Sequence, residues 1–303
     1  MPNWCANRIE ITAPSDVLAK IELWAKGREF PSHQKAIQQS IRLFLAGVAG
    51  RLKPQQPEYY APYPALTAHG CAERCVQSEA FSEWLALLQE NVWLDAEHCS
   101  RIDRCYQASG LNGLRWADLR EEEQACIAPL LRSQHHDWYA YTDNLSVNIS
   151  LFDMLDLPPD AQTMDLRFLC PTQLACEVNG FNGRLLTGVS STYDLYTHYY
   201  GTKWPVNCEP EMYYSGNTLV LDFDTAWAPP SKAVLSMLSE RYSCRLMHYF
   251  SEAGCDFCGY AQYQQGEQTE SEDSCLEREE DDDEWYEIVG PSWIIDNVPH
   301  YGG

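Results

Sequence analysis

The chain has 303 residues, of which 45% are hydrophobic and 12% aromatic, and its formal net charge is −23. This apolar content is sufficient for a buried core and excludes a wholly disordered chain, and the length suits one large or two ordinary domains. Because no run rich in Lys or Arg occurs, the composition argues against direct binding of nucleic-acid phosphates and favours a basic protein as the partner.

The sequence predicts a cytoplasmic protein with no membrane contact. Residues 1–15 lack the basic and apolar regions of a signal peptide, and no stretch reaches the roughly 18 apolar residues of a membrane span. Thirteen Cys residues are present, an odd number. Without an export signal we expect them to be reduced and mostly buried, and we expect no cofactor.

The chain begins with a predicted strand and two predicted helices. Residues 5–13, "CANRIEITA", alternate in polarity as a half-buried strand does. Residues 13–27 have the apolar spacing of a helix that Gly27 ends, and residues 32–50 read as a second helix. A strand followed directly by an amphipathic helix is half of a βαβ unit.

The next part of the chain is predicted to be mainly helical. Four prolines in residues 52–66 preclude regular structure there. A helical period returns between Cys71 and Arg132. We therefore expect a helical insertion at residues 31–140, after a first strand–helix unit at residues 1–30.

The later chain shows a second series of predicted elements. Short apolar runs predict strands at residues 193–204 and 217–227, and a proline-initiated helix follows at residues 229–242. Two more strands are predicted at residues 244–253 and 255–266.

The order of these elements is βα, insertion, ββαββ, which resembles a ferredoxin-like plan divided by a helical insertion. The predicted fold class is therefore α+β, with a ferredoxin-like antiparallel sheet. Residues 141–303 would form this domain together with residues 1–30, and an acidic loop is expected at residues 267–287.

Four sequence segments resemble a known family. They are "MPNWCANRIEIT" at the start, "TDNLSVNISLFDMLDLP" in the middle, "GTKWPVN" at residues 201–207 and "FDTAWAPP" at residues 223–230. Together they are similar to the Api-type family of enterobacterial plasmids and genomic islands, whose C-terminal part is ferredoxin-like. The resemblance implies a protein of mobile DNA, but it carries over no catalytic residue. Pro205 departs from the polar residue expected after the Trp, so a strand could end there.

Three groups of Cys and His could be read as chemical sites. Cys255 and Cys258 are spaced as a metal or redox pair, but on a strand their thiols would diverge. His135, His136 and Asp137 could supply a base and its orienting carboxylate, although a solvent-exposed loop is the favoured interpretation. A looser set matches no standard zinc spacing, so no metal site is predicted: His69, Cys71, Cys75, His98, Cys99 and Cys105.

Two pairs of residues near strand ends have both a structural and a functional interpretation. Asp222 and Asp224 would share one strand face, about 6.8 Å apart, either as the polar side of a half-buried strand or as part of an acidic binding face. Trp204 and Trp227 stand before prolines. We expect them to pack in the core, whereas an exposed pair would be an interaction site.

The strongest charge feature is the acidic run at residues 267–287, which holds twelve acidic residues and one Arg. Such runs are commonly solvated loops. This one is followed by the apolar segment "WYEIVGPSWII", which would tether it and lower the entropic cost of binding. The residues predicted to form an acidic binding surface are Glu279, Glu280, Asp281, Asp282, Asp283, Glu284, Asp222, Asp224, Glu121, Glu122 and Glu123.

The leading functional hypothesis is an acidic accessory protein that binds and inhibits a basic host protein. That partner would be a nucleic-acid-binding or defence factor, blocked by carboxylates that stand where DNA phosphates would. The alternative is a hydrolase or nucleotide-modifying enzyme with a cleft between sheet and insertion, and a third is a structural or regulatory module. None of the common catalytic motifs occurs, so an enzyme is the less favoured hypothesis.

Overall fold

The computed structural model describes residues 3–138, 150–280 and 286–303. The chain divides into two compact units. Unit 1 comprises Met1–Phe30, Ala161–Cys170 and Tyr196–Gly303, and unit 2 comprises Pro31–Asp160 and Pro171–Leu195. Within the described ranges, no helix has the length and apolar character needed to cross a membrane.

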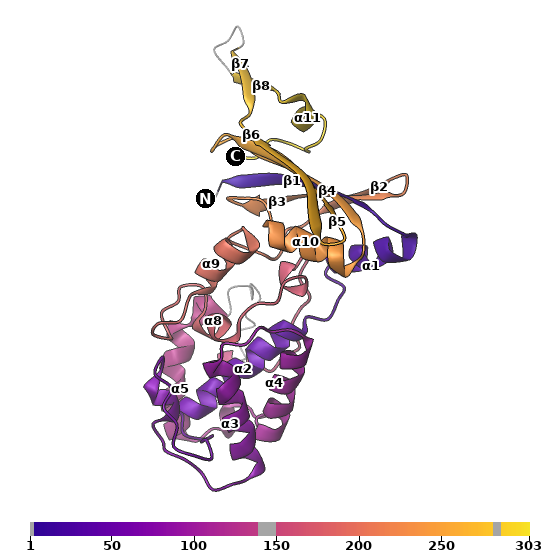
Figure 1. Cartoon of the computed structure of the whole chain (residues 1–303). Helices are drawn as coiled ribbons and strands as arrows, with labels where there is room; N and C mark the ends of the chain where they lie inside the picture. Colours follow the sequence, from indigo (N-terminus) through magenta and orange to yellow (C-terminus); the bar gives the residue numbers. More distant parts are fainter. Residues whose placement is uncertain (1–2, 139–149, 281–285) are drawn as a thin grey trace. The chain divides into compact units, whose positions relative to one another are not determined.

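Unit 1 is built on a six-stranded sheet in the order β2-β3-β1-β4-β5-β6, in which every neighbouring pair is antiparallel (Figure 1). The order of β1, α1, β2, β3, α10 and β4 along the chain, with β2-β3-β1-β4 in the sheet, is the ferredoxin-like arrangement. Strands β5 and β6 extend the sheet beyond β4. The prediction of an α+β chain with a ferredoxin-like sheet is confirmed. The elements are β1 (Trp4–Thr12), α1 (Ser15–Ala25), η3 (Leu166–Phe168), η4 (Tyr196–Tyr200), β2 (Glu211–Ser215), β3 (Thr218–Ala226), α10 (Lys232–Arg241), β4 (Arg245–Glu252), β5 (Phe257–Gln264), β6 (Glu267–Ser274), β7 (Glu277–Glu280), β8 (Tyr286–Gly290) and α11 (Ser292–Ile295).

The two faces of the sheet differ in what covers them. Alternate residues of β1, such as Ile9 and Ile11, are fully buried on the face that α1 and α10 cover. The opposite face, which we call the open face, carries Arg8 and Glu10 on β1. Part of the open face is covered by the C-terminal segment, where Ile294 and other apolar residues pack against Cys258 of β5.

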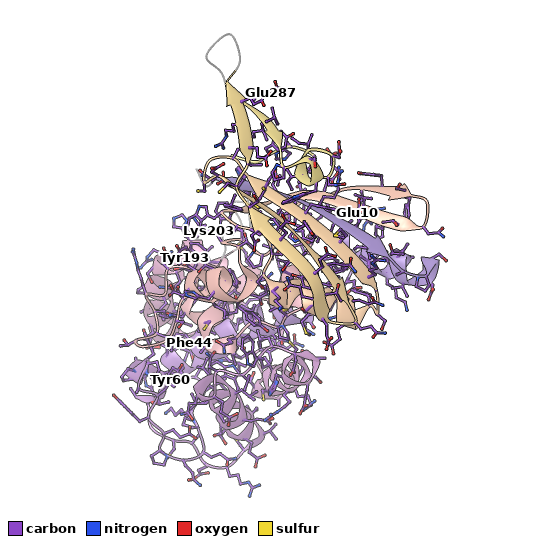
Figure 2. The ribbon with its side chains drawn as sticks, turned by 45° about the horizontal axis from the view of Figure 1, so that its top comes forward. Glu10, Phe44, Tyr60, Tyr193, Lys203 and Glu287 are labelled. Atoms are coloured by element: carbon purple, nitrogen blue, oxygen red, sulfur yellow. The ribbon has the colours of Figure 1, made fainter. Side chains whose placement is uncertain are left out.

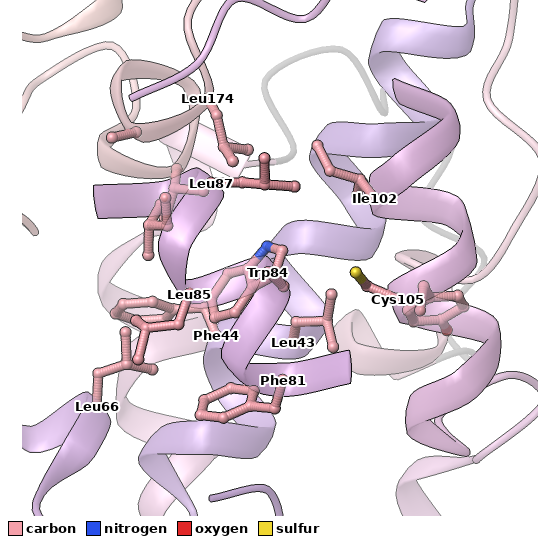
Figure 3. Packing of buried hydrophobic residues seen from close by; sticks show 14 of the residues in the cluster. Leu43, Phe44, Leu66, Phe81, Trp84, Leu85, Leu87, Ile102, Cys105 and Leu174 are labelled. Carbon is pink, nitrogen blue, oxygen red and sulfur yellow. The ribbon is translucent and has the colours of Figure 1, made fainter. Parts of the chain in front are cut away.

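Unit 2 is a helical bundle in whose described part the buried apolar residues form two clusters. Phe44 of α2, together with Phe81 and Trp84 of α3, is fully buried there (Figure 3). Arg42 is also buried, and its guanidinium pairs with Asp156 at 2.8 Å. The helices are α2 (Ser32–Val48), η1 (Pro64–Thr67), α3 (Val76–Gln89), α4 (Ala96–Ser109), η2 (Trp116–Asp118), α5 (Glu121–Ser133), α6 (His135–Trp138), α7 (Leu151–Met154), α8 (Leu174–Asn179) and α9 (Thr192–Leu195).

The strand predicted at residues 193–204 was wrong. This stretch forms α9 and the π-helical turn η4. Tyr196 and Tyr200 are both buried and their ring centroids lie 5.6 Å apart, so the aromatic residues follow a helical period of four. The second strand of the ferredoxin-like plan is instead β2, at Glu211–Ser215.

The acidic loop predicted at residues 267–287 was also wrong over much of its length. Glu267–Ser274 forms β6, which pairs with β5, and Glu277–Glu280 forms β7, which pairs with β8. An edge strand keeps its backbone hydrogen bonds to one neighbour while its charged side chains stay in water, so repulsion along the run does not prevent a strand.

The units also divide differently from the predicted domains. The first boundary, between residues 30 and 31, coincides with the prediction. The chain then returns to unit 1 at Ala161–Cys170 and goes back to unit 2 for Pro171–Leu195 before it enters the C-terminal strands.

Candidate functional site

The candidate site is the acidic edge, which we define as strands β6 and β7. Strand β6 is the outermost strand of the main sheet. Its carboxylates at Glu267, Glu270, Glu272 and Asp273 are all exposed, and β6 contains no basic residue. Pairing with β5 places Glu267, Glu270 and Glu272 on the open face and Asp273 on the opposite face. Backbone hydrogen bonds therefore fix a row of three carboxylates along one edge of unit 1.

The negative field of this edge reaches tyrosines on the neighbouring strands. Tyr260 of β5 donates a hydrogen bond from its hydroxyl to Glu270 Oε1 at 2.9 Å. This bond and the carboxylates around it raise the pKa of Tyr260 to about 12. Tyr249 of β4 has a raised pKa, first because of burial and then because of Glu10 and Glu270. Carboxylates of both β6 and β1 thus act on Tyr249, which lies between them on the open face (Glu10 of β1 is labelled in Figure 2).

Strand β7 follows β6 in the chain and forms a separate two-stranded sheet with β8, in which two like charges lie opposite each other. Glu279 pairs in register with Glu287 of β8, and both side chains are exposed. Like charges directly opposite on neighbouring strands destabilise a hairpin. The basic residue of β7, Arg278, forms an ion pair with Asp256 at 2.9 Å and donates to the carbonyl of Ala253. The hairpin therefore presents its carboxylates while its Arg is held by the chain itself.

Two of the predicted acidic residues are paired with basic side chains on the open face. Asp222 accepts two hydrogen bonds from Arg8, at 2.7 Å from Nε and 2.8 Å from Nη2. Asp224 lies 3.0 Å from Nε2 of His300, and burial raises the pKa of this carboxyl group. Both residues do lie on one strand face, as predicted, but their carboxylates are engaged within unit 1.

The three predicted glutamates of α5 have different environments. Glu123 is only 1% exposed. It pairs with Arg120 at 3.0 Å and Arg51 at 3.3 Å, and these contacts include the cap of the helix. Glu121 and Glu122 are exposed in the first turn of α5, where negative charge stabilises a helix. Glu123 is therefore a structural residue of unit 2.

The remaining predicted residues lie in or beside β7. The side chain of Glu280 and all of Asp281, Asp282, Asp283 and Glu284 lie outside the part of the chain that the structure describes. Glu279 is described and exposed. Among the described side chains, the predicted binding residues and the acidic edge therefore share Glu279. The carboxylates of β6 were not among the predicted binding residues.

The cysteine and histidine groups occupy ordinary structural positions. All thirteen cysteines are free thiols. Cys255 is exposed in the turn before β5, while Cys258 is buried within it. Cys71 lies before α3 and Cys75 is its N-cap residue, so the helical period predicted from Cys71 onward begins only at Val76. Among the described residues, no three His, Cys, Asp or Glu side chains gather as a metal site would require.

The segment containing His135 and His136 forms the short helix α6 instead of the predicted loop. Oδ1 of Asp137 accepts hydrogen bonds from the backbone and side-chain nitrogens of Asn182, at 2.9 and 2.8 Å. This carboxylate therefore fixes a turn in unit 2.

The tryptophans near strand ends are more exposed than predicted. Trp227 is 39% exposed, so the expectation that it packs fully in the core was wrong. Trp4 at the start of β1 is 37% exposed, and its ring lies 5.8 Å from that of Trp204. No pattern along the chain groups these residues, because they come from three distant segments.

Comparison with known proteins gives matches over both parts of the chain. The model of a family described as "Protein of unknown function (DUF1281)" matches residues 30–204, and one described as "Ferredoxin-like domain in Api92-like protein" matches residues 200–290. The uncharacterized protein YubB of Escherichia coli strain K12 is 44% identical over 142 residues, which is 46% of this chain and 98% of YubB. The uncharacterized protein YubA of the same strain is 33% identical over 149 residues, 49% of this chain and 89% of YubA. The crystal structure of the protein api92 from Yersinia pseudotuberculosis is similar with a TM-score of 0.84 and 36% identity, covering 90% of this chain and 98% of that one.

Proposed function

Because the chain belongs to the DUF1281 family, with the ferredoxin-like domain of Api92-like proteins, we propose that it is an acidic accessory protein of a mobile genetic element. In this proposal it acts in the cytoplasm and binds a basic, nucleic-acid-binding host protein, such as a defence factor, through the acidic edge. Binding would inhibit that protein by occupying its phosphate-binding surface.

The observation that carries the proposal is the row of exposed carboxylates that backbone pairing fixes on β6. A paired strand fixes the backbone from which these side chains project, so less backbone freedom is lost on binding than with a flexible acidic tail. The net charge of −23 adds a long-range field of the same sign, which speeds encounter with a basic surface.

The spacing of charge limits how closely β6 can imitate DNA. Eight strand residues at about 3.4 Å each span roughly 27 Å, so the three carboxylates on the open face of β6 give about one charge per 9 Å. One DNA strand carries about one charge per 3.4 Å and the duplex one per 1.7 Å. The open face of β6 therefore has less than half the charge density of a single DNA strand, and Glu277 and Glu279 of β7 would have to contribute to the same surface.

The test is a charge-matched pair of variants of the full chain. The first replaces Glu267, Glu270 and Glu272 with Gln, and the Glu270→Gln change keeps an acceptor for the Tyr260 hydroxyl. The control replaces three exposed glutamates elsewhere, Glu73, Glu90 and Glu209, with Gln. Both triple variants change the net charge by the same amount, so they separate the position of the charge from its total.

The partner is first captured from a host lysate at low salt. The rates at which wild type, the β6 variant and the control variant associate with the captured protein are then measured. The β6 variant should associate several-fold more slowly and lose part of the salt dependence, while the control stays near wild type. Duplex DNA should release the captured protein, because both would occupy one surface. Equal rates for the two triple variants, or a captured protein that DNA does not release, would contradict the proposal.

A further inference from the structure

Three segments that are distant in the sequence meet in a tryptophan–lysine cluster in unit 1. It consists of Trp4 from β1, Lys203 and Trp204 from the segment before β2, and Trp227 just after β3. The side-chain nitrogen of Lys203 lies 4.8 Å from the centroid of the Trp204 ring and 5.0 Å from that of Trp227. One ammonium group is thus in contact with two indole faces (Lys203 is labelled in Figure 2).

The rings are placed by the backbone. Trp227 has φ of +75°, a left-handed conformation that bulky residues rarely adopt, and its N–H donates to the carbonyl of Asn3 at 2.9 Å. Such strain persists where the surroundings impose it, and it is concentrated at functional sites. Trp4 lies opposite Ala226 in the sheet, and Ala226 immediately precedes Trp227 in the chain. The register of β1 with β3 therefore places Trp4 opposite the residue that precedes Trp227, and the Trp4 ring lies 5.8 Å from that of Trp204.

The cluster is accessible from solvent and has a carboxylate nearby. Trp4 and Trp227 each keep more than a third of their surface exposed. Asp224 is two residues before Ala226, on the same face as Trp4, which makes it a diagonal neighbour of Trp4. The two indole faces are the groups that attract an alkylammonium, because Asp224 is already paired with His300.

We propose that the tryptophan–lysine cluster is a binding site for a lysine side chain of a basic partner protein, and that Lys203 occupies it in the unbound protein. The position of Lys203 identifies the chemistry of the occupant, because it already shows an alkylammonium on both rings. The partner's lysine replaces Lys203 on the rings, and the side chain of Lys203 rotates into solvent. The number of cation–ring contacts is therefore the same before and after binding. The tryptophan–lysine cluster is separate from the acidic edge, and its binding of a lysine side chain does not depend on the function proposed for the acidic edge.

The test measures binding of N-acetyl-lysine amide to the full-length Lys203→Ala variant, with N-acetyl-norleucine amide as the uncharged probe. Lys232→Ala is the matched control, because Lys232 is an exposed lysine of α10 in the same unit. Indole N–H signals in nuclear magnetic resonance spectra report the site directly. The chain has ten tryptophans, so the signals of Trp204 and Trp227 are assigned with single Trp→Phe variants.

Removal of the internal competitor should tighten binding of the lysine probe by roughly tenfold, the value for two cation–ring contacts. The signals of Trp204 and Trp227 should shift, and the norleucine probe should leave them unchanged. Adding Trp227→Leu to Lys203→Ala should abolish the gain, with circular dichroism confirming the fold.

Three results would overturn the proposal: equal affinity of the Lys203→Ala and Lys232→Ala variants, equal shifts with norleucine, or shifts confined to other indoles. The comparison of the two lysine variants stands even if the tryptophan variant fails to fold.

Discussion

His248 on β4 should make the stability of unit 1 depend on pH. Its ring is almost completely buried between Ile9 of β1 and Ala261 of β5 in the sheet. Nε2 lies 3.1 Å from Oδ1 of Asn7. The Asn7 amide nitrogen donates to the carbonyl of Cys5 and the hydroxyl of Thr225, so Oδ1 is the acceptor that faces the ring. His248 must therefore donate from Nε2, and burial lowers its pKa to about 3.

The sign and size of the effect follow from the two pKa values. The unfolded chain, with a histidine pKa near 6.5, binds this proton at a higher pH than the folded chain does. The stabilising contribution is therefore present above about pH 6.5 and is lost as the pH falls toward the folded value. At about pH 5 the unfolded pKa is 1.5 units above the pH, and at about 1.4 kcal/mol per unit the loss is about 2 kcal/mol.

The assay is urea unfolding of wild type and His248→Gln at about pH 7.5 and pH 5, with hydrogen exchange of β4 peptides to identify the transition of unit 1. Gln keeps a donor for Asn7 but does not titrate, so the variant should lose about 2 kcal/mol less over this range than wild type. The exposed His136 provides the control, and His136→Gln should keep the wild-type pH dependence. If wild type and His248→Gln lose the same stability between these pH values, His248 is not the group that makes the stability of unit 1 depend on pH.

Two further predictions concern ion pairs. Asp222→Ala should destabilise unit 1 by about 2–3 kcal/mol, because the mostly buried guanidinium of Arg8 loses both hydrogen bonds. It should leave partner capture unchanged. If the melting temperature equals that of wild type, or if the variant no longer captures the partner, Asp222 belongs to the binding surface and not to the structural ion pair. Arg42→Met should destabilise unit 2 by about 3–5 kcal/mol in urea unfolding, since it strips the partly buried Asp156 of its cation. Adding Asp156→Leu should recover part of that loss. No recovery would mean that the packing of Arg42 against Phe152, or the hydrogen bonds that Asp156 accepts from Tyr106 and Gly113, outweigh the unpaired charge.

The part of the fold that could be predicted from the sequence is the part with a buried face. Strands β1, β3, β4 and β5 alternate in polarity because one side of each faces the helices. Strands β2 and β6 lie at the two edges of the sheet, and their sequences, "EMYYS" and "EQTESEDS", contain little apolar pattern. Backbone hydrogen bonds hold them, and these leave no mark in the side-chain sequence.

The site could be predicted only as a region of charge. The acidic run is visible in the sequence, but which carboxylates are neutralised depends on partners far away in the chain. Arg8 and Asp222 are 214 residues apart, and Arg51 and Glu123 are 72 apart. The tryptophan–lysine cluster depends likewise on the register of β1 with β3, which pairs Trp4 with Ala226.

The acidic edge and the tryptophan–lysine cluster would contribute to binding in different ways. Exposed carboxylates act over distances comparable to the Debye length, about 8–10 Å at physiological salt, so they mainly change the rate of encounter. Contact of an ammonium with an indole face needs approach to within about 6 Å of the ring centroid and removal of water, so it mainly slows dissociation. A basic partner that uses both would therefore be attracted along the edge and held at the cluster. The ammonium of Lys203 already lies on the rings of the cluster before binding, so the cluster adds little to the long-range attraction of a basic partner. The exposed carboxylates of the acidic edge would supply that attraction.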